Sequence, residues 1–158
     1  MKIIIKTVVI VGVVGLAIGY ISYFTFFKPP DLPEIPQFKV VAELAKTQYQ
    51  VGEDIWIMPS LINTSEQPIT IHSGDTLLFA KIYDINDKEV LYLPLLPPTL
   101  SLVSHILKPG IPYTEDYIFT LDQPGRYKIV VWAELSLNEN FADPVRIYAK
   151  PIWIEVSD

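Results

Sequence analysis

The chain has 158 residues and no cysteine, and its 12 basic and 18 acidic side chains give a formal net charge of −6. The missing cysteine excludes disulfides, thiolate-ligated zinc sites, iron–sulfur clusters and cysteine nucleophiles. Lys2, Lys6 and Lys28 flank the N-terminal apolar segment, so the remainder keeps 9 basic and all 18 acidic side chains, a balance of −9. An acidic domain without a basic cluster excludes nucleic-acid binding, because neutralising phosphates requires a basic face.

Residues 7–27 contain no charged side chain over 21 positions. At 1.5 Å per residue, a helix of this length spans roughly the 30 Å of a bilayer's hydrocarbon core. The alternative is a cleaved signal peptide, whose apolar region is shorter, about 7–15 residues. Here the apolar run continues into an aromatic cluster that ends at Phe27, which favours a retained anchor. The sequence therefore predicts one N-terminal transmembrane helix within residues 1–27, crossing the membrane through residues 7–27.

The charges around this segment predict its orientation. Lys2, Lys6 and the α-amino group precede it, and Asp31 and Glu34 follow Lys28 on the other side. By the positive-inside rule the short N-terminus is cytoplasmic, and the protein is a single-pass cell-membrane protein with an extracytoplasmic domain.

Two features frame the predicted anchor. Gly15 and Gly19 have the GxxxG spacing that lets a second helix pack closely, although glycine is also common in membrane helices for other reasons. Residues 28–37, KPPDLPEIPQ, contain four prolines in ten positions and predict a semi-rigid, extended linker. At about 3.1 Å per residue the linker reaches some 30 Å.

Residues 38–158 show the period-two alternation of β-strands, with turn signals between the runs. Short strands at such spacing indicate a sandwich or a barrel. We expect an all-β domain, an immunoglobulin-like antiparallel β-sandwich. The alternating runs are 38–44, 55–61, 69–71, 78–83, 113–121, 127–135 and 145–156.

One turn is more specific than the others. Asp122, Gly125 and Tyr127 lie in the stretch DQPGRY, in which a turn with glycine opens a strand that begins with tyrosine. The pattern resembles the tyrosine corner of immunoglobulin-like sandwiches, where the hydroxyl bonds to backbone a few residues upstream. An ordinary turn followed by a core tyrosine is the alternative.

Between residues 51 and 135 the order of signals resembles the bacterial intracellular proteinase inhibitor family. The resemblance implies an immunoglobulin-like domain of the kind that often serves for binding. The family's Trp-rich segment is replaced here by residues 91–94. The matching features are Gly52-Glu53, Asn63-Thr64-Ser65, Ser73-Gly74-Asp75, Phe79, Glu89-Val90, Lys108-Pro109-Gly110 and Pro124-Gly125-Arg126-Tyr127.

The overall plan of the chain also resembles subunit II of haem-copper oxidases, which has an N-terminal helix and an outside β-sandwich. Trp132, Ser136, Asn140 and Asp143 fall at the spacing of that family's copper ligands, after a Pro-Gly-x-Tyr turn. The family's copper ligands are two cysteines, a histidine and a methionine, and none of these residue types stands at the four positions. This resemblance implies a copper-less subunit, as in quinol oxidases.

The remaining candidate residues do not form a catalytic or metal site in the sequence. His72 and His105 are far apart, and no GxSxG elbow is present. We therefore expect no enzyme activity, no cofactor and no bound metal. Asn63 opens an N-glycosylation sequon at a strand end, where we expect it to be exposed.

The segment 93–105, LPLLPPTLSLVSH, has three prolines, six large aliphatic residues and no charge apart from its histidine. Such a loop on a water-facing domain often marks a contact surface. We expect Leu95, Leu96, Pro97 and Pro98 to bind a protein partner, although the prolines could instead cap the sandwich. The overall prediction is an interaction or accessory subunit of a membrane complex. A copper-less oxidase subunit II is the alternative, and a tethered protease inhibitor is the third.

Overall fold

The computed structural model describes residues 37–95 and 101–158, which form twelve β-strands and no helix. The predicted anchor, with Gly15 and Gly19, and nearly all of the predicted linker lie outside these residues. A search of the described residues finds no helix long and apolar enough to cross a membrane. The all-β class expected from the alternating pattern is confirmed for this part of the chain.

The first sheet is built around the nine-residue strand β3 (Ile55–Asn63). Strand β1 (Phe38–Leu44) pairs with it antiparallel along one edge, with Phe38 opposite Asn63. Two short strands, β8 (Pro112–Thr114) and β9 (Tyr117–Phe119), pair with its other edge. The sequence had suggested one run over residues 113–121, which the structure divides at Glu115 and Asp116.

The second sheet is built around the longest strand, β10 (Gly125–Leu135). Antiparallel neighbours pair with it on both edges: β5 (Leu78–Tyr83) on one, and β11 (Val145–Tyr148) and β12 (Ile152–Ser157) on the other. Strand β6 (Glu89–Leu93) extends the sheet beyond β5, and β2 (Gln48–Gln50) pairs parallel to β12. The run expected over 145–156 divides at Pro151, because proline cannot donate to a sheet ladder.

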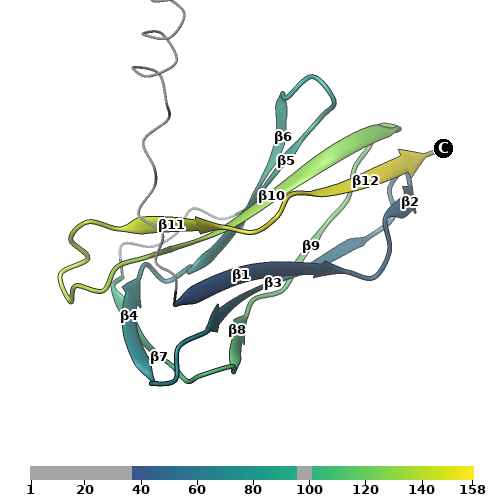
Figure 1. Ribbon diagram of the computed structural model, residues 1–158. Coiled ribbons are helices and arrows are strands. Elements are labelled where there is room, and N and C mark those ends of the chain that lie inside the picture. Colours follow the sequence, from purple (N-terminus) through teal and green to yellow (C-terminus); the bar gives the residue numbers. More distant parts are fainter. Residues whose placement is uncertain (1–36, 96–100) are drawn as a thin grey trace, which may run out of the picture. The chain divides into compact units, whose positions relative to one another are not determined.

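A small third sheet consists of β4 (Ile69–Ser73) and β7 (Val103–Leu107), paired antiparallel. The backbones of His72 and Ser136 exchange two hydrogen bonds of 2.8 Å, which attach β4 to the end of β10. Figure 1 shows β4 and β7 at one end of the described domain, close to β1 and β8.

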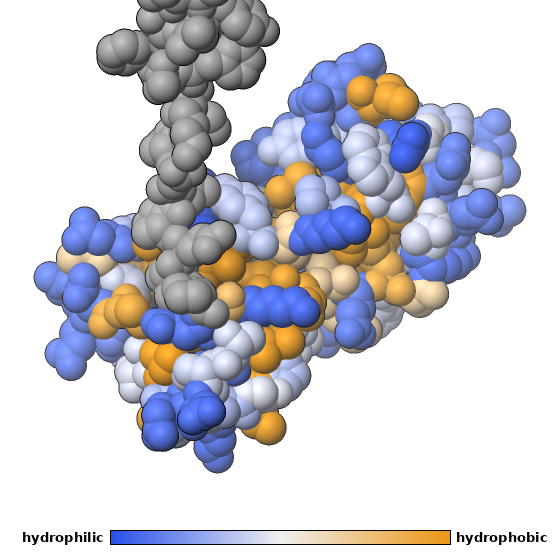
Figure 2. Space-filling view, in the orientation of Figure 1, coloured by the Kyte–Doolittle hydropathy of each residue, from blue (hydrophilic) through white to orange (hydrophobic). Residues whose placement is uncertain are grey.

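The core lies between the first and second sheets. Alternate residues of β3 and β10 face inward, and Ile55, Ile57, Leu61, Ile129 and Leu135 are completely buried. Burying one such side chain contributes about 1.5–3 kcal/mol. In Figure 2 apolar residues gather in a band along the middle of the face shown, and hydrophilic residues lie toward both ends.

The turn into β10 is held by a tyrosine. The Tyr127 hydroxyl donates a 2.9 Å hydrogen bond to the carbonyl of Gln123, four residues upstream, and its side chain is buried. Its ring lies over Gly125, where an added Cβ would contact the ring at 3.6 Å. Asp122 is exposed beside this turn. The tyrosine-corner interpretation expects this hydrogen bond, which ties the segment between β9 and β10 to the start of β10.

Two buried tyrosines provide a matched test of this bond. We expect Tyr127→Phe to lower the free energy of unfolding by about 0.5–1.5 kcal/mol, because one hydrogen bond is lost and the ring is kept. Tyr49 is also buried, but its hydroxyl has no hydrogen-bond partner. Tyr49→Phe should therefore leave the stability unchanged or raise it. Urea unfolding of both variants checks this, and equal losses at the two positions would contradict a special role for Tyr127.

Candidate interaction surfaces

The predicted contact loop begins where β6 leaves the core. Leu93 is buried and pairs with Ala80, whereas Leu95 is 68% exposed two residues later. Leu96, Pro97 and Pro98 lie outside the described residues. The structure thus places one of the four predicted contact residues at the surface. Leu95 is not unusual in this respect, because Ile85 and Ile106 are exposed to a similar degree.

The free edge of β6 lies beside a groove. Within the described residues β6 pairs only with β5, so its other edge is not paired there. An open groove of about 450 Å³ runs alongside, between β6 and the turn that precedes β10. Its lining residues are 88–91, 120–123 and Tyr127. The groove lies at the start of β6, next to Tyr127, whereas Leu95 follows the other end of this strand.

Asn63 is not at the surface, so the sequence-based expectation was wrong. Its side chain is completely buried, and its Nδ2 donates hydrogen bonds of 2.8 and 2.9 Å to the carbonyls of Gln67 and Leu107. Its Oδ1 accepts hydrogen bonds from both the backbone N–H and the hydroxyl of Ser65. The amide that a glycan would need is already used to hold the β3–β4 turn against β7. A sequon shows the local sequence only, and it does not show which way the side chain points.

Removing this buried amide should be costly. We expect Asn63→Ala to lower the free energy of unfolding by about 2–4 kcal/mol, because two carbonyls and two donors lose their partner together. The exposed Asn86 provides the control, since Asn86→Ala should change stability by less than about 0.5 kcal/mol. Thermal and urea unfolding of both variants measure the difference. A loss at Asn63 as small as that at Asn86 would contradict the assigned network.

The two histidines, distant in sequence, lie on adjacent strands of the third sheet. His72 Nδ1 lies 2.9 Å from the hydroxyl of Ser104, and His105 Nε2 lies 3.0 Å from the hydroxyl of Ser73. Sequence spacing gave no sign of this proximity, because the antiparallel pairing of β4 with β7 creates it. In the described part of the chain no group of three or more metal-ligating side chains forms.

The Ser73–His105 pair is not arranged as a nucleophile and its base. The Ser73 hydroxyl donates its one proton to the carbonyl of Gly74 at 2.6 Å. His105 Nε2 must therefore donate to Ser73, whereas a general base would accept. Ser73 is also completely buried, so no substrate can reach it. The pair links the two strands of the small sheet.

Burial lowers the pKa of His105 below its ordinary value of 6.5. The nearby His72 adds to this lowering, whereas the carboxylate of Glu115 acts against it. The ring of His105 also meets that of Tyr113 edge-on at 4.9 Å. The folded protein therefore holds His105 neutral at a pH at which the unfolded chain already binds a proton.

This shift predicts a pH dependence of stability with a definite sign. The contribution of neutral His105 is complete above about pH 6.5 and is lost as the pH falls from there through the lower folded-state pKa. We expect the free energy of unfolding to decrease between pH 7 and pH 5. His105→Gln keeps a donor for Ser73 and should flatten this decrease. An unchanged slope in the variant would assign the pH dependence to other groups.

The outer side of the second sheet carries an aromatic cluster that sequence reasoning did not identify. Phe79 and Trp132 are only 7% and 5% exposed, although neither belongs to the core between the sheets. Their rings stack at 5.5 Å with an interplanar angle of 16°, and Tyr92 and Tyr148 flank Trp132 at 6.1 and 6.0 Å. We call these four residues the aromatic face. The signal was available, since each of them alternates with inward-facing residues along its strand.

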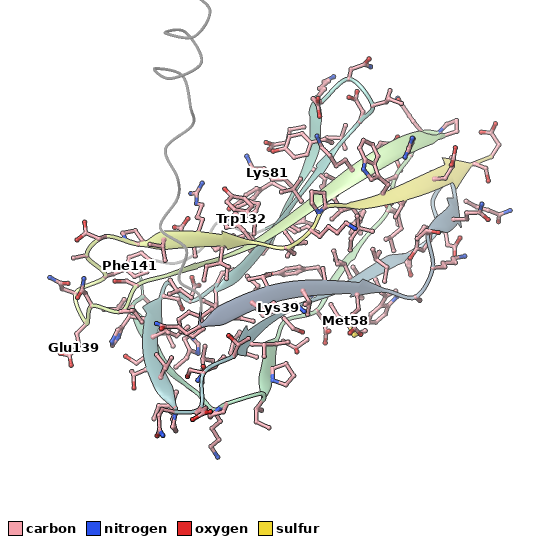
Figure 3. The ribbon with its side chains drawn as sticks, viewed as in Figure 1. Lys39, Met58, Lys81, Trp132, Glu139 and Phe141 are labelled. Carbon is pink, nitrogen blue, oxygen red and sulfur yellow. The ribbon has the colours of Figure 1, made fainter. Side chains whose placement is uncertain are left out.

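Cations border the aromatic face. The Arg146 guanidinium lies 5.7 Å from the Trp132 ring and bonds to Glu134 at 2.5 Å. Lys81 lies 5.4 Å from the Tyr92 ring and pairs with Glu89 at 2.7 Å. Figure 3 shows Trp132 and Lys81 near each other, away from Met58 on β3. The face thus combines aromatic rings with partly solvated ion pairs.

The cationic border continues along β10 toward β12. Arg126 lies 4.5 Å from the Trp153 ring, and Lys128 lies between the rings of Tyr83 and Trp153 while pairing with Asp87. Four of the nine basic side chains that follow Lys28 therefore lie on this side of the second sheet. They are Lys81, Arg126, Lys128 and Arg146.

One atom of the aromatic face lacks its hydrogen bond. The indole Nε1–H of Trp132 is buried and has no acceptor in the structure. A buried donor without a partner costs about 1–3 kcal/mol, and each such group in a native protein calls for an explanation. The four positions at the spacing of copper ligands lie on β10 and the loop that follows it, and they include Trp132 itself and buried Ser136.

No protein-family model matches the chain, and no curated protein matches it. Among solved structures, the sporulation control protein Spo0M from Bacillus subtilis is similar over 77% of this chain and 50% of its own, with 18% identity and a TM-score of 0.47. A CARDB domain from Pyrococcus furiosus, described in complex with di-metal ions, matches over 76% of this chain and 92% of its own, with 13% identity and a TM-score of 0.46.

A β-glucosidase from Listeria innocua is similar over 77% of this chain, with 13% identity and a TM-score of 0.42. The chain spans half the length of Spo0M and 16% of that β-glucosidase. At these identities and TM-scores the similarities carry no argument about function.

Proposed function

We propose that this protein is a membrane-anchored interaction subunit, whose extracytoplasmic domain is an immunoglobulin-like sandwich that binds a protein partner. The proposal is non-enzymatic and involves no cofactor. The copper-less oxidase subunit II and the tethered protease inhibitor are its competitors, and both would also need a partner. The 21 uncharged residues at positions 7–27, preceded by Lys2 and Lys6, support the anchor and its orientation.

The strand order supports the immunoglobulin-like assignment. One sheet holds β1, β3, β8 and β9, and the other holds β2, β12, β10, β5, β6 and β11. Such domains place three or four strands in one sheet and extend the other with additional edge strands. The corner tyrosine of that fold lies near the start of its sixth strand, and Tyr127 occupies the start of the central strand β10.

Exposed Leu95, directly after the edge strand β6, is the observation that favours a protein partner. An unpaired edge strand can accept an extended segment of another chain through backbone hydrogen bonds. An apolar side chain beside it adds buried area to the contact. The charge of −9 after residue 28 keeps the domain soluble, whereas Leu95 itself has no charge to repel a neighbour.

Substitution of Leu95 in the full-length, membrane-bound chain tests the proposal. We expect Leu95→Asp to reduce co-purification of the partner at least several-fold and to change the free energy of unfolding by less than about 0.5 kcal/mol. Ile85→Asp is the matched control, because Ile85 is 65% exposed in the turn between β5 and β6. Association should persist in this control.

Two results would contradict the proposal. A large fall in melting temperature in Leu95→Asp with association unchanged would place Leu95 in the packing of the domain. Equal loss of association in both variants would show that any added charge weakens it. Haem in the purified complex would instead favour the oxidase subunit as the identity of the protein.

A further inference from the structure

The chain enters the described domain beside a turn that is firmly held. The N–H of Thr64 donates a 2.7 Å hydrogen bond to the carbonyl of Gln37, the first described residue. Next to Thr64, the carbonyl of Asn63 accepts a 2.9 Å hydrogen bond from the N–H of Gly110. The entry point of the chain and the turn of residues 108–111 therefore lie on either side of the end of β3.

Large aliphatic side chains are exposed on this turn and on the strand before it. Ile106 on β7 is 70% exposed and Ile111 is 60% exposed, so they are two of the four most exposed large apolar residues in the described part of the chain. The backbone between them is fixed, because the carbonyl of buried Leu107 accepts a hydrogen bond from Asn63 and the N–H of Ile111 bonds to the carbonyl of Lys108 at 3.3 Å. Apolar side chains on a fixed backbone can be covered with little loss of conformational entropy.

Cations without a carboxylate partner lie beside these isoleucines. Lys108 is on the turn itself, and Lys39 lies on β1 opposite Ile62 at the same end of the first sheet. Both lysines are exposed, and neither forms an ion pair with any residue that the structure describes. Glu66, on the turn between β3 and β4, opposes them with one negative charge. These turns and strand ends thus carry more positive than negative charge, whereas the chain after residue 28 has a balance of −9.

The place of this surface along the chain favours a bilayer as its occupant. The predicted linker of residues 28–37 reaches some 30 Å, so the end of the domain at which it joins has the shortest tether to the membrane. Exposed aliphatic side chains enter the boundary between headgroups and acyl chains, and lysines beside them are attracted to anionic lipids. The exposed isoleucines and unpaired lysines at the chain entry match both requirements.

We propose that Ile106, Lys108 and Ile111, with Lys39 beside them, bind the headgroup layer of the bilayer in which the chain is anchored. The inference rests on the membrane anchor of the proposed function and is independent of the partner at Leu95. The isoleucine side chains enter the acyl boundary, and the lysine ammonium groups pair with lipid phosphates. The contact holds the domain in one orientation on the membrane. Figure 1 shows the β5–β6 turn on the opposite side of the domain from β7, so this turn stays in water.

The chain contains no cysteine, so a single introduced cysteine can carry a unique fluorescent label. The purified full-length chain is reconstituted into nanodiscs of phosphatidylcholine and phosphatidylglycerol, with a nitrobenzoxadiazole label at Ile106→Cys or Ile111→Cys. We expect either label to be quenched at least about twofold by lipids with a nitroxide near the headgroup, and to be shielded from a water-soluble quencher. Ile85→Cys is the matched control, because Ile85 is 65% exposed on the β5–β6 turn and its label should show the opposite pattern.

Further variants separate the apolar and the charged parts of the surface. Ile106→Asp should return the label at Ile111→Cys to water, because a carboxylate is costly in the acyl boundary. Lys39→Gln with Lys108→Gln should weaken the quenching by lipid, and so should omission of phosphatidylglycerol. All three positions are exposed, so the melting temperature should not change. Leu95→Asp should leave the quenching as it is.

The possible failures can be told apart. A label at Ile111→Cys that is as open to water as the one at Ile85→Cys, in chains that co-elute with the discs, would overturn this contact and leave the anchor intact. Chains that do not co-elute with the discs would refute the anchor and the contact together. Shielding from water without quenching by lipid would show that protein covers the surface, a second copy of the chain included, and would also overturn the proposal.

Discussion

The domain depends on β10, because this strand contributes to almost every other part of the structure. Its backbone pairs with β5 on one edge and with β11 and β12 on the other. Ser136, directly after its last residue, holds β4 through backbone hydrogen bonds to His72. Its inward side chains form one wall of the core, and its outward side chains include Trp132. The period of two along one strand therefore determines both the packing that stabilises the domain and the surface that it presents.

Buried polar groups fix the parts that the core does not reach. Asn63 ties the β3–β4 turn to β7, and Ser73 joins His105 across the small sheet. Tyr127 holds the entry to β10 in the same manner, through one hydrogen bond to backbone. Each of these groups is satisfied, so each contributes to stability and to the precision of the turn. Tyr49 and Trp132 are the exceptions, and a structural role explains neither orphan donor.

Leu95 and the aromatic face differ in chemistry because they lie on different elements. Leu95 adjoins a free strand edge, and it suits a partner that contributes backbone and apolar side chains. The aromatic face lies on the flat side of the same sheet and combines rings with cations.

The sequence by itself determined the all-β class and, to within two residues, the limits of β1, β3, β4, β5 and β10, because alternation is a local property that depends only on neighbouring residues. It also identified the corner at Tyr127, whose hydrogen bond spans four residues. The sequence-based expectation that Asn63 is exposed was wrong, and the sequence did not show that His72 and His105 lie on adjacent strands. Burial and strand register are set by contacts between distant segments. The aromatic face escaped for the same reason: its four rings come from β5, β6, β10 and β11, and only the order of those strands in the sheet brings them together.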